Sequence, residues 1–287
     1  MFCARLLFLL VVFITAVAQQ PPTQLDKLRA EGYRALFNLD YETARRNFQK
    51  IIELAPDDPV GPECIATSLW IQQLNESWRL KSTLYNDKIE KAAANEKPKV
   101  DQRQIDEFHK WTRLARQLAE KRLRQNSRDV EALYQLGAAE GLEAAYGAGV
   151  EHKYMAALRT GSSAVDHHRQ VLELSPKFYD AELTIGLQDY VIGSLPLPTK
   201  MLAGTFGVHG SRKRGLKELE QVAREGQWAR DVARMLLIDL YQREKRWDDA
   251  IATARELSEE YPRNYLFKQQ LAAATTRKAG DTHKPNK

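Results

Sequence analysis

A four-residue pattern occurs near both ends of this chain with identical spacing. It combines small or apolar residues with a terminal proline, at intervals of twelve, four and eight positions. Its two copies are Gly32, Ala44, Phe48, Pro56 and Ile238, Ala250, Ala254, Pro262. Small side chains at this spacing allow two consecutive helices to pack closely, and the proline ends the second helix. Because one helix pair cannot bury its apolar face alone, we expect an all-α stack of such pairs.

Related positions occur between the two copies. Gly137 and Gly186 each follow an apolar residue within a predicted first helix, and Ala164 and Pro176 have the spacing of the outer copies. The unit resembles the tetratricopeptide repeat (TPR), a helix–turn–helix of about 34 residues. We therefore predict a right-handed TPR-like solenoid of about five antiparallel helix pairs, closed by an end helix at Asn264–Arg277.

Several short segments resemble those of a group of bacterial exported TPR proteins. They are Lys177–Ala181, Gly186–Tyr190, Gly193–Pro196, Phe206–Gly210, Gly215–Leu219 and Tyr261–Asn264. A similar order occurs in a eukaryotic TPR family linked to the mitochondrial outer membrane. The resemblance covers roughly residues 129–267 and implies a TPR fold. It provides no catalytic residues to carry over.

The first residues predict a signal peptide. Arg5 precedes the apolar stretch Leu6–Val17, and Ala16-Val17-Ala18 provides a small-x-small cleavage site. We expect cleavage after Ala18 and export to the periplasm or cell envelope of a bacterium. An uncleaved membrane anchor is the alternative.

The remaining chain divides into a solenoid at 19–278 and a disordered tail at 279–287. The solenoid is interrupted by an insertion at 75–103 and by an irregular apolar segment at 193–210. Two interpretations of 191–206 stay open. It plugs the solenoid core, or it presents an exposed apolar patch to a membrane or partner.

The net charge limits the classes of partner that this chain can bind, and the cysteine count limits the disulfides that it can form. The net charge of +5 is mild, and export argues against a nucleic-acid partner. After cleavage, Cys64 is the one cysteine left, so no internal disulfide forms. We expect a buried structural thiol, with intermolecular pairing as the alternative. The basic face of Gln104–Arg124 is interpreted as a solvated helix surface.

Motifs for chemistry are mostly absent. The glycines around Ser211–Arg214 lack a phosphate-loop pattern, although an anion at that helix start is an alternative. The histidines lack metal-ligand spacing, so we expect no metal, cofactor or small-molecule substrate. One hypothesis remains in which two of Glu140, Glu143 and Glu151 act as the carboxylate pair of a cell-wall hydrolase.

Four aromatic residues suit either the core or a partner-binding patch. They are Trp70, Trp78, Tyr85 and Trp111.

The sequence as a whole favours a non-catalytic protein-interaction scaffold of the cell envelope, which binds a peptide or protein in its concave face. Groove residues are expected where the repeats are interrupted, at Tyr146, Tyr154, Tyr190 and Arg212. One alternative is peripheral attachment to a membrane through Val191–Phe206 and the basic residues that follow it. A helical cell-wall enzyme is the other.

Overall fold

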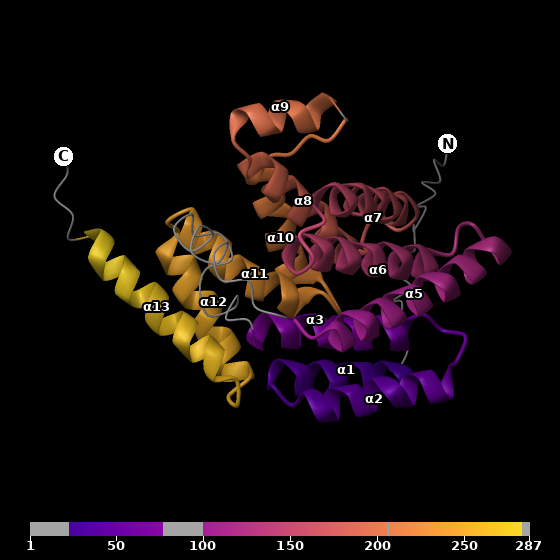
Figure 1. Ribbon diagram of the computed structural model, residues 1–287. Helices are drawn as coiled ribbons and strands as arrows, with labels where there is room; N and C mark the ends of the chain where they lie inside the picture. Colours follow the sequence, from indigo (N-terminus) through magenta and orange to yellow (C-terminus); the bar gives the residue numbers. More distant parts are fainter. Residues whose placement is uncertain (1–22, 77–99, 206, 283–287) are drawn as a thin grey trace, which may run out of the picture.

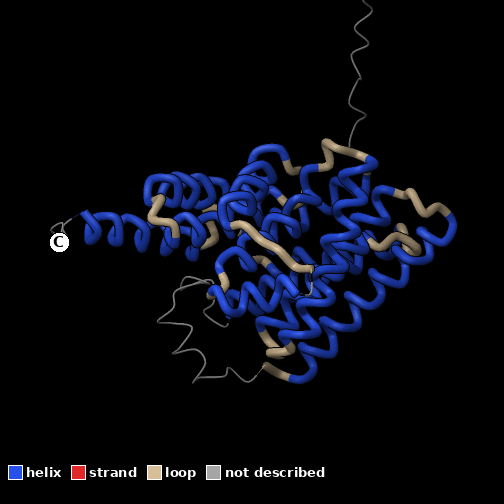
Figure 2. Tube along the Cα trace, turned by 90° about the horizontal axis from the view of Figure 1, so that it is seen from above, coloured by secondary structure: helices blue, strands red, loops and turns tan. Residues whose placement is uncertain are grey.

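Every regular element in the computed structural model is a helix within the described residues, which are 23–76, 100–205 and 207–282 (Figures 1 and 2). The elements are α1 (Gln24–Phe37), α2 (Tyr41–Leu54), α3 (Val60–Glu76), α5 (Gln102–Gln125), α6 (Val130–Gly149), α7 (Tyr154–Leu174), η1 (Tyr179–Ala181), α8 (Glu182–Ser194), α9 (Leu197–Thr205), α10 (Arg212–Glu225), α11 (Arg230–Arg243), α12 (Trp247–Glu260) and α13 (Tyr265–Thr282).

Consecutive helices pack as antiparallel pairs. The pairs are α1/α2, α3/α5, α6/α7, α8/α10 and α11/α12, and α13 covers the last of them (Figure 1). The short helix α9 is inserted between the two members of the fourth pair. The described part of the chain is therefore a TPR-like helical-repeat solenoid of five pairs and an end helix, as predicted.

The small residues of the repeated pattern lie where helices touch. A methyl group on Gly32 would lie 2.2 Å from Cε1 of Phe48, and one on Gly137 would lie 2.4 Å from Cδ2 of His168. The buried alanines at the equivalent positions are Ala44, Ala164, Ala250 and Ala254. The prolines that follow the ends of α2, α7 and α12 are Pro56, Pro176 and Pro262. These positions confirm the predicted repeat.

Ala250 gives a direct test of this contact. It is fully buried among Leu237, Leu240 and Tyr241, so a tryptophan there would overpack the interface between α11 and α12. We expect Ala250→Trp to lower the free energy of unfolding by about 1–3 kcal/mol, measured by urea denaturation. The exposed Ala272→Trp is the matched control. Equal stability of the two variants would show that Ala250 is not a close-contact position.

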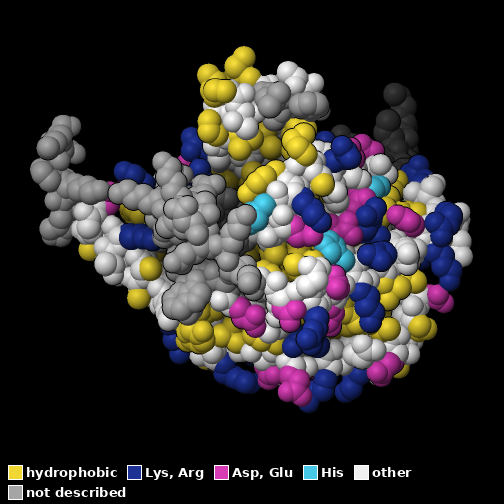
Figure 3. Space-filling model, in the orientation of Figure 1, with side chains coloured by type: hydrophobic (Ala, Val, Ile, Leu, Met, Phe, Trp, Pro, Cys, Tyr) yellow, Lys and Arg dark blue, Asp and Glu magenta, His cyan; other side chains and the backbone are white. Residues whose placement is uncertain are grey.

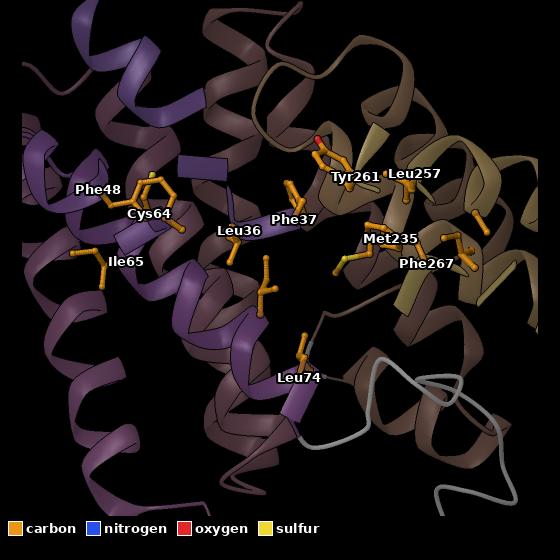
Figure 4. Packing of buried hydrophobic residues seen from close by; sticks show 14 of the residues in the cluster. Leu36, Phe37, Phe48, Cys64, Ile65, Leu74, Met235, Leu257, Tyr261 and Phe267 are labelled. Carbon is orange, nitrogen blue, oxygen red and sulfur yellow. The ribbon is translucent and has the colours of Figure 1, made fainter. Parts of the chain in front are cut away.

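The two ends of the solenoid meet. Leu36 and Phe37 of α1 share one hydrophobic cluster with residues of α11, α12 and α13 (Figure 4). The rings of Phe37 and Tyr261 lie 5.3 Å apart, and the Asn264 side-chain amide donates a 2.8 Å hydrogen bond to the Phe37 carbonyl oxygen. Because the last pair packs on the first, the array curls back on itself, and the curl buries apolar surface that an open stack would leave exposed.

A buried cation joins the two halves of this closed array. The Arg29 guanidinium of α1 lies 4.2 Å from the Trp228 ring, just before α11, and its Nη2 lies 4.0 Å from Oε2 of Glu63 in α3. Asp180 of η1 fixes the Trp228 segment, since its carboxylate accepts hydrogen bonds from three consecutive backbone N–H groups, the shortest from Ala229 at 2.7 Å. Buried contacts around Arg29 therefore join α1 and α3 to the segment before α11.

The boundary between the solenoid and the C-terminal tail differs from the predicted one. Helix α13 continues to Thr282, so the prediction of a disordered tail from 279 is wrong for its first four residues. The indole Nε1 of Trp247 donates a 3.2 Å hydrogen bond to Asp281, which holds this last turn against α12. The rest of the tail and the predicted signal peptide at 1–18 lie outside the described residues.

The predicted insertion at 75–103 is described only at its edges, because 77–99 lie outside the described residues. Helix α3 extends to Glu76 and α5 begins at Gln102, so both members of this pair are longer than the repeat requires. Among the helices in the described ranges, none combines the length and apolar character needed to cross a bilayer.

Candidate docking surface

Helix α9 stands away from the body of the solenoid. It packs on the end of α8, and its side chains Leu197 and Met201 are 71% and 66% exposed. Figure 3 shows hydrophobic side chains over α9 and on the surface directly below it. The interpretation of 191–206 as a core plug is therefore wrong for Leu197 and Met201 of α9, whereas Ile192 at the end of α8 is buried. Pro196 and Pro198 lie where the chain leaves α8, and a proline cannot continue a preceding helix.

The chain at residue 193 and the chain at residues 210–212 lie in close backbone contact and form a neck from which α9 projects. A methyl group on Gly193 would lie 2.4 Å from the Arg212 nitrogen, and one on Gly210 would lie 2.7 Å from the Asp189 carbonyl oxygen. Only glycine permits such an approach of two backbones. The chain therefore enters and leaves the α9 loop at almost the same point, and the loop projects outward.

Polar contacts hold the base of this neck. The guanidinium of Arg214 donates to the buried carboxylate of Asp189, with Nη2 at 2.7 Å from Oδ1. The hydroxyl of Tyr190 donates a 2.8 Å hydrogen bond to Glu244, and Nη1 of Arg212 lies 3.4 Å from the same carboxylate. These bonds join α8 and α10 to the end of α11, so α9 is carried on a fixed base.

Two of the four predicted groove residues are exposed. The side chain of Tyr154, at the start of α7, is 64% exposed, and Arg212 is exposed at the neck. Because α7 and α8 are antiparallel neighbours, the start of α7 lies toward the end of α8 from which α9 departs. Met155 is also exposed there. Tyr154 and Met155 therefore form an exposed pair of large hydrophobic residues at the start of α7.

The other two groove residues are core residues, which corrects their predicted role. Tyr146 is 2% exposed and its ring stacks on Phe108 at 3.9 Å. The ring of Tyr190 is buried among α8, α10 and α11. An aromatic ring is large enough to fill the gap where two helix pairs join, and both tyrosines serve that purpose. Neither can contact a partner in this structure.

The apolar segment of the projection was identified from the sequence only as a whole. The alternative of membrane attachment through Val191–Phe206 included Leu197 and Met201, whereas Met155 of α7 was not predicted as a contact. A further signal for the projection is the pair of prolines beside this apolar run. Proline in a helical repeat marks a point where the chain leaves the packed array.

The three candidate carboxylates are engaged in contacts with basic side chains of the chain itself. Glu140 and Glu143 both lie near Arg116, at 3.6 Å and 3.0 Å. Glu151 binds His109 at 3.1 Å, and contacts with Lys153 and His109 lower its pKa overall despite partial burial. A general acid requires a raised pKa, whereas the pKa of Glu151 is lowered. In the described parts of the chain no cluster of three metal-ligating side chains is present.

The remaining candidates are structural. Cys64 is fully buried, and burial raises the pKa of its thiol, as expected for an unreactive core cysteine. Trp70 packs edge-on against Tyr146 at 5.7 Å, and Trp111 is partly buried in the same cluster. The predictions for Trp78 and Tyr85 lie outside the described residues.

The carboxyl of Glu218 makes the base of the neck sensitive to pH. Burial, followed by the nearby Asp189, raises its pKa to about 7. The folded chain therefore binds a proton that the unfolded chain has released, so this group weakens the fold as pH rises from about 4.5 to 7. We expect Glu218→Gln to be about 1 kcal/mol more stable than the wild type at pH 8, after allowance for partial solvation, and equally stable at pH 4. Melting temperatures at both pH values test this, and an identical difference at both would contradict it.

Comparisons with known proteins add little to this description. No model of a known protein family matches the chain. No curated protein matches it. Among solved structures, it is similar to the crystal structure of a thermophilic TPR protein from Thermus thermophilus, with 14% sequence identity, 88% of this chain and 99% of that chain covered, and a TM-score of 0.46. The TPR-like architecture therefore rests on the helix pairing described above.

Proposed function

We propose that this chain is a non-catalytic scaffold of the bacterial cell envelope that docks on its partner through α9. The observation that carries the proposal is the exposure of Leu197 and Met201 on a helix held away from the packed body. Exposed apolar surface of this kind is costly in water and marks interaction sites. Envelope localisation is part of the proposal and depends on the predicted signal peptide.

The α9 end is a better docking site than the concave face predicted from the sequence. Arg29 contacts Trp228 and Glu63, so these side chains are engaged within the chain. At the meeting point of the two ends, Phe37 is covered by Tyr261. Leu197 and Met201 of α9 are by contrast exposed to solvent.

Site-specific photocrosslinking tests the proposal. A photoreactive amino acid replaces Met201 in one variant and Leu54, which is 53% exposed on α2, in a matched control. In illuminated cells we expect a reproducible adduct with a protein or lipid from position 201 and none from position 54. An equal pattern of adducts from the two positions would contradict docking through α9.

A further inference from the structure

The chain around α9 has an unusual charge distribution. Between Asp189 and Glu218 the sequence contains no aspartate or glutamate. The basic residues of the same stretch are Lys200, Arg212, Lys213, Arg214 and Lys217. In a chain with 38 acidic residues in 287, this stretch is basic and apolar throughout. A surface of this composition attracts an anionic partner.

The exposed apolar residues lie on α9, and all of the basic residues except Lys200 lie on α10. Leu197 and Met201 are four positions apart on α9, so they lie on one face of the helix. Arg212 and Lys213 are exposed at the neck, where α10 begins. The projection therefore has an apolar tip and a cationic base.

Not all of these cations are available to a ligand. Arg214 is bound to the buried carboxylate of Asp189, and Arg212 shares Glu244 with Tyr190. Lys213 is exposed on the first turn of α10, and Lys200 lies half-buried on α9 itself. The cationic charge that a partner meets is then moderate, and its attraction for an anionic surface depends on ionic strength.

This arrangement matches the two parts of a membrane interface. Apolar side chains enter the boundary between headgroups and acyl chains, while basic side chains remain among anionic headgroups. The exposed ring of Tyr154 adds an aromatic residue, and tyrosine is enriched at the membrane–water interface.

We infer that the partner of α9 is an anionic lipid surface, with Leu197 and Met201 inserted into it and Lys200 and Lys213 facing its headgroups. The inference rests on the proposed function of α9 as a docking element and names its partner. The attachment is peripheral and reversible, since one short helix inserts few apolar side chains.

Flotation with vesicles tests the inference. Purified mature protein, which begins at Gln19 after the predicted cleavage, is mixed at low salt with vesicles of phosphatidylethanolamine and phosphatidylglycerol, or with phosphatidylcholine vesicles alone. We expect the protein to float with the anionic vesicles, to float less in high salt, and to remain unbound with the neutral ones. The double variant Leu197→Glu/Met201→Glu should lose binding by about tenfold or more. Leu54→Glu, a charge change at an exposed leucine elsewhere, should bind like the wild type.

The outcomes separate this inference from the proposed function. Circular dichroism and melting temperature establish that each variant is folded. Wild-type protein that stays at the bottom of the gradient with anionic vesicles overturns the lipid inference, as does an equal loss in Leu54→Glu. If the photocrosslinker at position 201 still captures one protein specifically, the partner is a protein and the proposed function stands. If position 201 also gives no specific adduct, both fail.

Discussion

Arg29→Ala is expected to lower the free energy of unfolding by about 3–5 kcal/mol, measured by denaturant titration. Arg29 is 5% exposed and stacks on Trp228 while facing the buried carboxylate of Glu63. Truncation leaves that carboxylate without its cation and removes the contact that links α1 to the chain before α11. Both effects act in the same direction, so this is the largest effect expected from a single polar substitution here.

A second variant distinguishes the lost charge pair from lost packing. Arg29→Met/Glu63→Gln removes both charges and keeps most of the side-chain volume, so we expect it to recover the larger part of the lost stability. Stability of Arg29→Ala within about 1 kcal/mol of the wild type would contradict the account, because a surface ion pair contributes no more than that.

Gly215→Ala is expected to destabilise the fold by about 3 kcal/mol. A methyl group on Gly215 would lie 2.4 Å from the Gly186 carbonyl oxygen and 2.5 Å from the Tyr190 nitrogen. Both are backbone atoms, so no side chain can move aside and α10 must shift from α8. The neck of α9 would shift with it, and we expect docking through α9 to weaken as well.

The matched control for Gly215 is Gly161→Ala in α7. Its added methyl group would lie 3.5 Å from the Ala144 methyl carbon, an ordinary contact. Since alanine favours helix over glycine by up to about 1 kcal/mol, this variant should be as stable as the wild type or slightly more stable. Urea denaturation of both variants tests the pair. Equal stabilities would show that α8 and α10 do not touch at Gly215.

The repeat was predictable because its determinants are local in sequence. Gly32 and Phe48 meet across one helix pair, and the requirement for a small residue there is visible as a spacing. The proline after each second helix is a similarly local signal. Closure of the array was not predictable, since Asn264 contacts a carbonyl 227 positions away. That contact depends on small rotations between successive pairs, which no short pattern encodes.

The candidate site was predictable only in part. Tyr146 and Tyr154 both lie near the interruption between α6 and α7, yet one is buried and the other exposed. An aromatic residue at such a point suits both environments, so its sequence position does not decide which one it occupies. The apolar segment containing Leu197 was recognised, but its exposure follows from the backbone contact of Gly193 and Gly210, which is a tertiary feature.

Depth measurement on a spin label at position 201 tests the docking of α9 most directly. The label is attached to Met201→Cys, or to Leu54→Cys as control, in the mature protein that begins at Gln19 and therefore lacks Cys3. Cys64 is buried, so it should not react. With anionic vesicles, we predict that the label at 201 becomes accessible to oxygen and protected from a water-soluble nickel chelate, while the label at 54 does not change. A label at 201 that stays as open to the chelate as the label at 54 would contradict the insertion of α9 into lipid.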